Sequence, residues 1–83
     1  MTIEYGKLRK LTARELIGAL VRDGFFLYSQ KGSHQRYRHS DGRRVTVSFH
    51  HPSDTFPPKT LKRIIREQAR WREEDIQRLG LVS

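Results

Sequence analysis

Gly32-Ser33-His34 is the stretch of the sequence whose residue types best suit chemistry. Glycine and serine favour a turn, and they separate an aromatic run, Phe25–Tyr28, from an alternating basic run, His34–Arg38. A histidine at the first position after such a turn is held by a strand and exposed by a loop. Because imidazole titrates near neutrality, this position suits a general acid or base. The alternative is a polar hairpin turn without a chemical role.

Cationic residues flank His34 in a pattern that suits a phosphate group. Alternation along an extended strand places Arg36 and Arg38 on the face of His34, opposite Tyr37 and the other odd-numbered residues. Cations beside the histidine could bind a phosphate and stabilise developing negative charge. The turn glycine permits close backbone approach, and the serine offers a hydroxyl or an amide to a phosphate oxygen. The predicted substrate-binding residues here are Lys31, Gly32, Ser33, Arg36 and Arg38. The candidates for a second proton donor are Lys31, His39 and His50.

The composition indicates one small basic domain. The chain has 83 residues, 17 Lys and Arg against 9 Asp and Glu, a net charge of +8 and no cysteine. This balance favours a polyanionic partner, nucleic acid first and an acidic protein second. Without cysteine, disulfides and thiolate metal sites are excluded, which suits the cytoplasm, and no apolar run is long enough to span a membrane. We expect a single domain over residues 1–83, with a core at about 11–71 and a C-terminal extension at 72–83.

Hydrophobic periodicity predicts an α+β fold with the order α-β-β-β-α. Thr12 and Glu15 form a capping box that opens the first helix, and Gly24 suits the left-handed residue that closes it. Val45 and Val47 alternate with polar residues, so a three-stranded antiparallel sheet should have one apolar face, with the helices packed on it. The expected helices span 13–23 and about 61–71, and the expected strands span 25–30, 34–39 and 44–49. Residues 1–11 are expected to be extended, 50–58 to form a loop, and the segment after Glu73 to form one or two helical turns.

A basic stripe marks one side of the second predicted helix. Its members are Lys59, Lys62, Arg63, Arg66 and Arg70. Such a stripe is either a solvated helix face or a surface that contacts phosphates, and we include Lys62 and Arg66 among the candidate substrate-binding residues.

The aromatic residues divide into two groups. Trp71 is expected to pack under the second helix, and Tyr37 is expected in the core. Tyr5 and Tyr28 are left open, because their spacing allows stacking on the bases of single-stranded RNA without requiring it.

These segments, in this order, resemble the HicA (YcfA-like) family of small bacterial mRNA interferase toxins. The resemblance covers about residues 11–79. Its pieces are Glu15-Leu16-Ile17, Asp23-Gly24-Phe25, Gln30-Lys31-Gly32-Ser33-His34, Tyr37-Arg38-His39, Asp41-Gly42-Arg43, Val45-Thr46-Val47, His51-Pro52, Thr60-Leu61, Ile64-Ile65 and Gln68-Ala69. The resemblance implies a fold like the double-stranded RNA-binding domain, mRNA as substrate, His34 as catalytic residue, and a HicB-type antitoxin as partner. It implies no cofactor.

Two positions depart from the family pattern. Lys59 and Arg70 stand where the family often has glycine, before the threonine that opens the second helix and after Gln68-Ala69. Loss of the second glycine predicts that the helix runs on without a break.

The leading hypothesis is therefore a toxin endoribonuclease that uses His34 and no metal ion. His50 and His51 are adjacent, so on an extended chain they point in opposite directions and chelate poorly. A non-catalytic RNA-binding module on the same fold is the first alternative, and a domain that binds only an acidic protein is the second. Recognition of DNA by a helix-turn-helix is disfavoured, because three strands separate the two helices.

Overall fold

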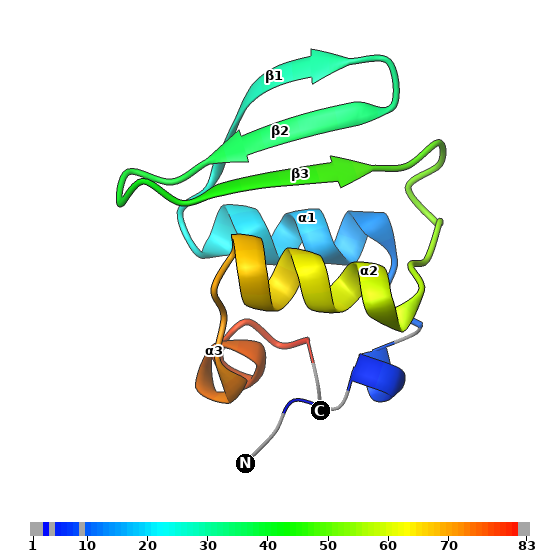
Figure 1. Cartoon of the computed structure of the whole chain (residues 1–83), viewed down its shortest axis with the longest axis vertical. Coiled ribbons are helices and arrows are strands. Elements are labelled where there is room, and N and C mark those ends of the chain that lie inside the picture. Colours follow the sequence, from blue (N-terminus) through cyan, green and yellow to red (C-terminus); the bar gives the residue numbers. More distant parts are fainter. Residues whose placement is uncertain (1–2, 4, 9, 82–83) are drawn as a thin grey trace.

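The structure is a computed structural model that describes residues 3, 5–8 and 10–81 (Figure 1). It confirms an α+β fold with a three-stranded antiparallel sheet, and α1 and α2 lie side by side against the sheet. The elements are η1 (Tyr5–Leu8), α1 (Ala13–Arg22), β1 (Phe26–Lys31), β2 (His34–Arg38), β3 (Arg44–Ser48), α2 (Pro58–Lys62), η2 (Arg63–Gln68) and α3 (Glu73–Arg78). Among the described residues, no helix is long and apolar enough to cross a bilayer.

Helix α1 begins and ends as its local sequence predicts. The Thr12 hydroxyl accepts a hydrogen bond from the Glu15 amide at 3.2 Å, and the Glu15 carboxylate accepts one from the Thr12 amide at 3.0 Å. Gly24 has a φ of +104°, the left-handed conformation that closes the helix. A β-carbon at Gly24 would also lie 2.9 Å from His39 Nε2, so both conformation and space require glycine. The helix ends at Arg22, one residue before the predicted end.

The sheet has the order β1-β2-β3. The first strand differs from its predicted span by one residue at each end, and the other two differ by one residue at the C-terminal end. Phe25 was predicted to open the first strand, but its amide donates to Leu20 O at 2.9 Å and so belongs to the end of α1. The first strand therefore runs from Phe26 to Lys31. The second and third end at Arg38 and Ser48, one residue early.

One face of the sheet supplies its share of a single hydrophobic core. Tyr37, Val45 and Val47 are buried there, and Phe49 packs against them in part. The helices contribute the other half, with Leu16, Leu20, Leu61, Ile64 and Ile65 all buried. This is the expected arrangement of an apolar sheet face covered by amphipathic helices.

The second helix is where the predicted boundaries are wrong. It begins at Pro58, a residue suited to the first helical turn, instead of Leu61. It ends at Gln68 instead of Trp71, after a π-helical stretch in which Ala69 N donates to Ile64 O at 2.8 Å. The predicted run-on does not occur, because Arg70 itself adopts the left-handed conformation, with a φ of +57°. The reversal lets Trp71 N donate to Ile65 O at 2.8 Å and directs the indole into the core, where it is 3% exposed.

The segments outside the central elements also pack on the core. The expected short C-terminal helix is α3, with three acidic residues in its first turn, and Ile76 and Leu79 are buried in the common core. The N-terminal segment was expected to be extended, but residues 5–8 form a 3₁₀ turn that buries Leu8. The rest of that prediction falls partly on Met1, Thr2, Glu4 and Arg9, which lie outside the described residues.

A buried carboxylate ties α1 to the C-terminal segment. We call it and its partners, Arg43, Trp71 and Arg78, the Asp23 cluster. The Asp23 side chain is 8% exposed, and its Oδ2 accepts from Trp71 Nε1 at 2.8 Å and pairs with Arg43 Nη1 at 3.0 Å. Its Oδ1 accepts from Arg78 Nη2 at 2.8 Å. Burial raises the pKa of Asp23, but the hydrogen bonds from Trp71 and Arg78 and the charge of Arg43 outweigh it, so the pKa lies below its ordinary value.

Candidate active site

The turn between β1 and β2 fixes the position of His34. Gly32 is the first of two turn residues and has a φ of +59°, whereas Ser33 has no positive φ. Positive φ at the first central residue alone is the pattern of type II′ hairpins, in which glycine is favoured. The Ser33 carbonyl accepts from the Phe49 amide at 3.1 Å, and the hydroxyls of Ser33 and Ser48 lie 3.5 Å apart. The turn is thus held against the end of β3.

The register of the sheet forms three cross-strand rows on the face turned away from the core. Directly opposite residues in an antiparallel pair share a face, with β-carbons about 4.5–5.5 Å apart. The first row is Lys31, His34 and Ser48, the second is Ser29, Arg36 and Thr46, and the third is Phe26, Arg38 and Arg44. We call these nine residues, together with Tyr28, the outer face.

A bulge in β1 determines which of its side chains join the outer face. Leu27 pairs with Tyr37 and Ser29 pairs with Arg36, so Tyr28 is an extra residue without a partner. Strict alternation from Phe26 would place Lys31 on the core side of the sheet. The extra residue changes the parity, and Lys31 therefore lies beside His34 in the first row.

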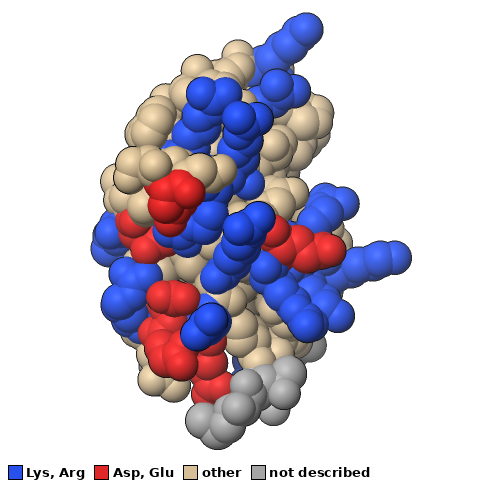
Figure 2. Space-filling view, turned by 60° about the vertical axis from the view of Figure 1, so that its left-hand side comes forward, with Lys and Arg blue, Asp and Glu red and all other residues tan. Residues whose placement is uncertain are grey.

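The outer face is strongly cationic. The three strands contain no aspartate or glutamate, and they carry Lys31, Arg36, Arg38 and Arg44. Among the described residues, Lys31, Arg36 and Arg44 form no side-chain hydrogen bond or ion pair. In Figure 2 the uppermost part of the molecule, at the height of β1 and β2 in Figure 1, shows Lys and Arg side chains and no acidic ones. This face is therefore suited to a polyanion.

The two histidines of the β2 region lie in opposite environments. His34 is exposed, and within residues 3, 5–8 and 10–81 no hydrogen bond or ion pair holds its imidazole. His39 is largely buried, its Nε2 lies 2.7 Å from Asp23 O, and its Nδ1 accepts from the Asp41 amide at 3.1 Å. Its ring also packs edge-on against Phe25 at 5.1 Å. His34 is free to exchange protons with a ligand, whereas both ring nitrogens of His39 serve the structure.

The other two candidates for a second proton donor are better placed than His39. Lys31 lies directly opposite His34 across the β1-β2 pair. His50 lines a shallow hollow beside the turn with Gly32 and Ser33. The amides of His50 and His51 both donate to Asp54 Oδ2, at 3.0 and 3.1 Å, and these bonds hold the pKa of Asp54 below its ordinary value. In the described part of the chain, no three His, Asp or Glu side chains are grouped to hold a metal ion.

The structure does not bring all the predicted substrate-binding residues together. Lys62 and Arg66 are exposed on α2 and η2, where they line a shallow groove with Lys59, Arg63 and Glu67. The outer face lies on the other side of the sheet, away from these helices. The helical groove and the outer face are therefore separate basic surfaces, and His34 lies on the outer face.

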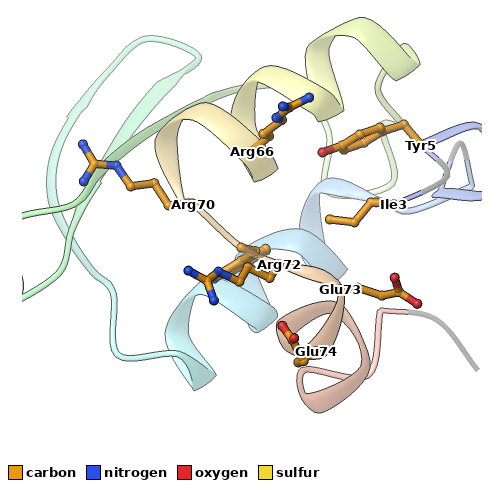
Figure 3. Close-up of a pocket in the computed structure, with 8 residues that line it drawn as sticks. Ile3, Tyr5, Arg66, Arg70, Arg72, Glu73 and Glu74 are labelled. Carbon is orange, nitrogen blue, oxygen red and sulfur yellow. The ribbon is translucent and has the colours of Figure 1, made fainter. Parts of the chain in front are cut away.

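A third hollow lies between the N-terminal segment and the end of the helices (Figure 3). Tyr5 lines it together with Arg66, and its hydroxyl points toward the helix that carries this arginine. Burial raises the pKa of the Tyr5 hydroxyl, although the charge of Arg66 opposes this shift. Glu73 and Glu74 line the same hollow, so its charge is mixed and it resembles a packing seam more than an anion site.

Sequence reasoning missed part of the outer face. The alternation in β3 placed Thr46 and Ser48 outward, but it gave no reason to connect Ser48 with His34. That link depends on the register between β2 and β3. Phe26 and Arg44 were not singled out at all, and only the pairing of both with Arg38 shows that they share its face.

The outer face is thus part of a small antiparallel sheet and carries an exposed histidine among cations that have no acidic partner in the described part of the chain. The sequence profile described as HicA toxin of bacterial toxin–antitoxin systems matches residues 13–71, which include every strand, α1 and the second helix. The chain belongs to the HicA toxin family. Toxins of such systems are paired with an antitoxin, so membership of the family implies an antitoxin as protein partner. No curated protein sequence matches the chain.

Proposed function

We propose that this toxin is an endoribonuclease that cleaves mRNA in the cytoplasm, with His34 as the catalytic residue and without a metal ion. The first row of the outer face carries this proposal, because it sets a free imidazole between the Lys31 ammonium and the Ser48 hydroxyl. Gly32 and Ser33 bring the backbone close on one side, and Arg36 follows in the second row. These groups can hold a phosphate and exchange a proton with it.

RNA supplies its own nucleophile for such a reaction, the 2′-hydroxyl. The His34 imidazole takes the proton of the 2′-hydroxyl as that oxygen attacks phosphorus. Lys31 and Arg36 stabilise the negative charge that develops on the phosphate oxygens. The bond to the 5′-oxygen breaks and this oxygen takes up a proton, which leaves a 2′,3′-cyclic phosphate and a 5′-hydroxyl. Lys31 or His50 supplies that proton in this proposal, since Lys31 lies opposite His34 and His50 lies beside the turn.

The helical surface has a lesser part in this proposal. Lys62 and Arg66 lie on the other layer of the molecule, so any phosphates they bind are remote from the scissile one. They contribute to the affinity for a long RNA, since each phosphate contact adds a salt-dependent increment to the binding free energy.

The charge of the outer face also suggests how an antitoxin would neutralise the toxin. We propose a HicB-type antitoxin that covers the outer face with an acidic surface and so excludes RNA from His34. Complementary charge would also speed the encounter of the two proteins.

The test is cleavage of a generic single-stranded mRNA by the purified protein in EDTA. We expect His34→Ala to lower the rate by about 10²- to 10⁴-fold, the usual contribution of a general acid or base. His51→Ala is the matched control, because His51 is also exposed but lies outside the rows, and it should leave the rate unchanged. Products should carry cyclic phosphate ends.

Three other outcomes are informative. Binding of RNA without cleavage by wild-type protein would favour the non-catalytic RNA-binding module, which the same basic face would also support. Equal cleavage by wild type and His34→Ala would assign the chemistry to another residue. Activity only after addition of a divalent metal would refute the metal-independent mechanism.

A further inference from the structure

Large apolar side chains are exposed on β1 in a way that packing does not explain. Among the described residues, the exposed large hydrophobics are Val21, Phe26, Leu27 and Tyr28, and three of the four are consecutive in β1. Phe26 is 53% exposed and Tyr28 is 40% exposed. A single exposed hydrophobic residue is ordinary, but a row of them usually marks a binding surface.

Two of these exposed side chains, the aromatic ones, belong to the outer face. Phe26 lies opposite Arg38 in the third row, and the bulge adds Tyr28 to the same side. The Arg38 guanidinium lies over the Tyr28 ring, 4.1 Å from its centroid. The Arg38 guanidinium and both rings thus lie together on the outer face, two rows from His34.

We propose that Phe26, Tyr28 and Arg38 form a base-stacking subsite for single-stranded RNA, two rows away from His34. This inference rests on the proposed function in that it makes RNA the ligand. The rings would stack on unpaired bases while Arg36 and Arg44 bind the phosphates between them. A strand held in this way would run along the outer face and present a phosphate to His34 at its other end.

The chemistry of the surface favours this occupant over the others. Every base has a flat π face, and base stacking on aromatic or guanidinium planes is available only when the bases are unpaired. A duplex would cover the cations with phosphates but leave both rings without partners. The absence of acidic residues from all three strands also works against self-association of this face, since two copies would oppose like charges.

The test measures binding without cleavage. Affinity is determined in EDTA, in the His34→Ala background, for a fluorescent single-stranded RNA of about 12 nucleotides and for the same backbone with abasic sites throughout. We expect Tyr28→Ala to weaken binding of the normal RNA by about 5- to 100-fold, which is the usual effect of losing one stacked base. Phe26→Ala should act in the same direction. Neither change should alter binding of the abasic RNA.

Two control variants separate stacking from other effects. Tyr28→Phe keeps the ring and should bind normal RNA like its parent. Val21→Ala removes an exposed apolar side chain from α1, on the other layer, and should change nothing. A 2-aminopurine placed in the RNA should be quenched by the parent protein and not by Tyr28→Ala, which reports stacking directly.

The outcomes distinguish this inference from the proposed function. Unchanged affinity in Tyr28→Ala and Phe26→Ala would overturn the subsite, even if His34 proves catalytic. An equal loss for normal and abasic RNA would also overturn it, because the rings would then act through the fold or the charge. Loss of antitoxin binding or of self-association, with RNA binding intact, would assign the rings to a protein interface instead. Stacking in a protein that never cleaves RNA would leave the subsite standing and refute only the proposed function.

Discussion

Two regions of the molecule place arginine side chains in opposite surroundings. In the Asp23 cluster, Arg43 is largely buried, pairs with Asp23 and Asp41, and donates to Ala69 O at 2.6 Å. On the outer face, Arg36 and Arg44 are exposed and have no acidic partner among the described residues. Arg38 and Arg44 even lie directly opposite each other, a like-charged pair that disfavours the fold.

This difference separates a structural role from a binding role. A cation that is buried with a carboxylate and a carbonyl has its hydrogen bonds satisfied, and removing its partner leaves an uncompensated charge. Exposed cations grouped without acids gain nothing from the folded chain alone. Such an arrangement is suited to an anionic ligand.

The strongest test of the comparison removes the carboxylate at the centre of the Asp23 cluster. We expect Asp23→Asn to lower the free energy of unfolding by about 2 kcal/mol, because Arg43 and Arg78 lose the charge that offsets their desolvation. Denaturant unfolding measures this loss. Asp41→Asn is the control, since that carboxylate is half exposed and its loss should cost much less. An Asp23→Asn protein as stable as wild type would show that the cluster does not hold the fold.

The same carboxylate predicts a pH dependence. The pKa of Asp23 is lower in the folded chain than in the unfolded chain, where it is about 3.9, so its contribution is fully present above that value. It is lost as the pH falls through the lower, folded pKa. Thermal unfolding between pH 6 and pH 2 should therefore show stability falling from about pH 5 downwards. The slope of stability against pH should be shallower in Asp23→Asn. An unchanged slope would assign the acid sensitivity to other carboxylates.

A smaller effect of the opposite sign is expected next to the cluster. Arg70 occupies the left-handed region at a φ of +57°, which costs an L-residue about 1 kcal/mol or more relative to glycine. Arg70→Gly should raise the free energy of unfolding by about 1 kcal/mol. Arg70→Ala is the informative control, since it removes the same charge but keeps the strain and should bring no such gain.

The smallest effect on stability is expected on the outer face. Arg36→Gln should change the free energy of unfolding by no more than about 0.5 kcal/mol, since the side chain is exposed and unpaired. It should nevertheless weaken RNA binding and reduce the slope of log affinity against log salt by about 1, the value for one phosphate contact. A large loss of stability with an unchanged salt slope would reverse the roles assigned to the two regions.

Local sequence signals predicted the elements that depend on local contacts. The capping box and Gly24 placed the first helix within one residue of its ends, because these residues satisfy the helix termini directly. Alternation placed Tyr37 in the core and His34 with Arg36 and Arg38 on one face. Each of these inferences needed only the parity or the spacing of neighbouring residues.

Features that depend on distant contacts were missed or mistaken. The bulge at Tyr28 has no distinctive residue, and only the pairing of β1 with β2 reveals it. The helix was expected to continue through Arg70, but burial of Trp71 and its bond to Asp23 outweigh the conformational cost there. The separation of Lys62 and Arg66 from His34 follows from the layers of the fold, which no periodicity reports.

The bulge in β1 also gives the chain a residue that can be removed. On both sides of Tyr28 the pairing of β1 with β2 keeps one register, so a chain shortened by this residue could form a regular ladder with every other partner retained. The row of His34 and the pair of Leu27 with Tyr37 would remain on their own faces of the sheet. Loss of a single codon could therefore take away an aromatic ring while sparing the fold and the histidine. A deletion at this point of the strand would therefore change the aromatic part of the outer face and leave the row of His34 in place.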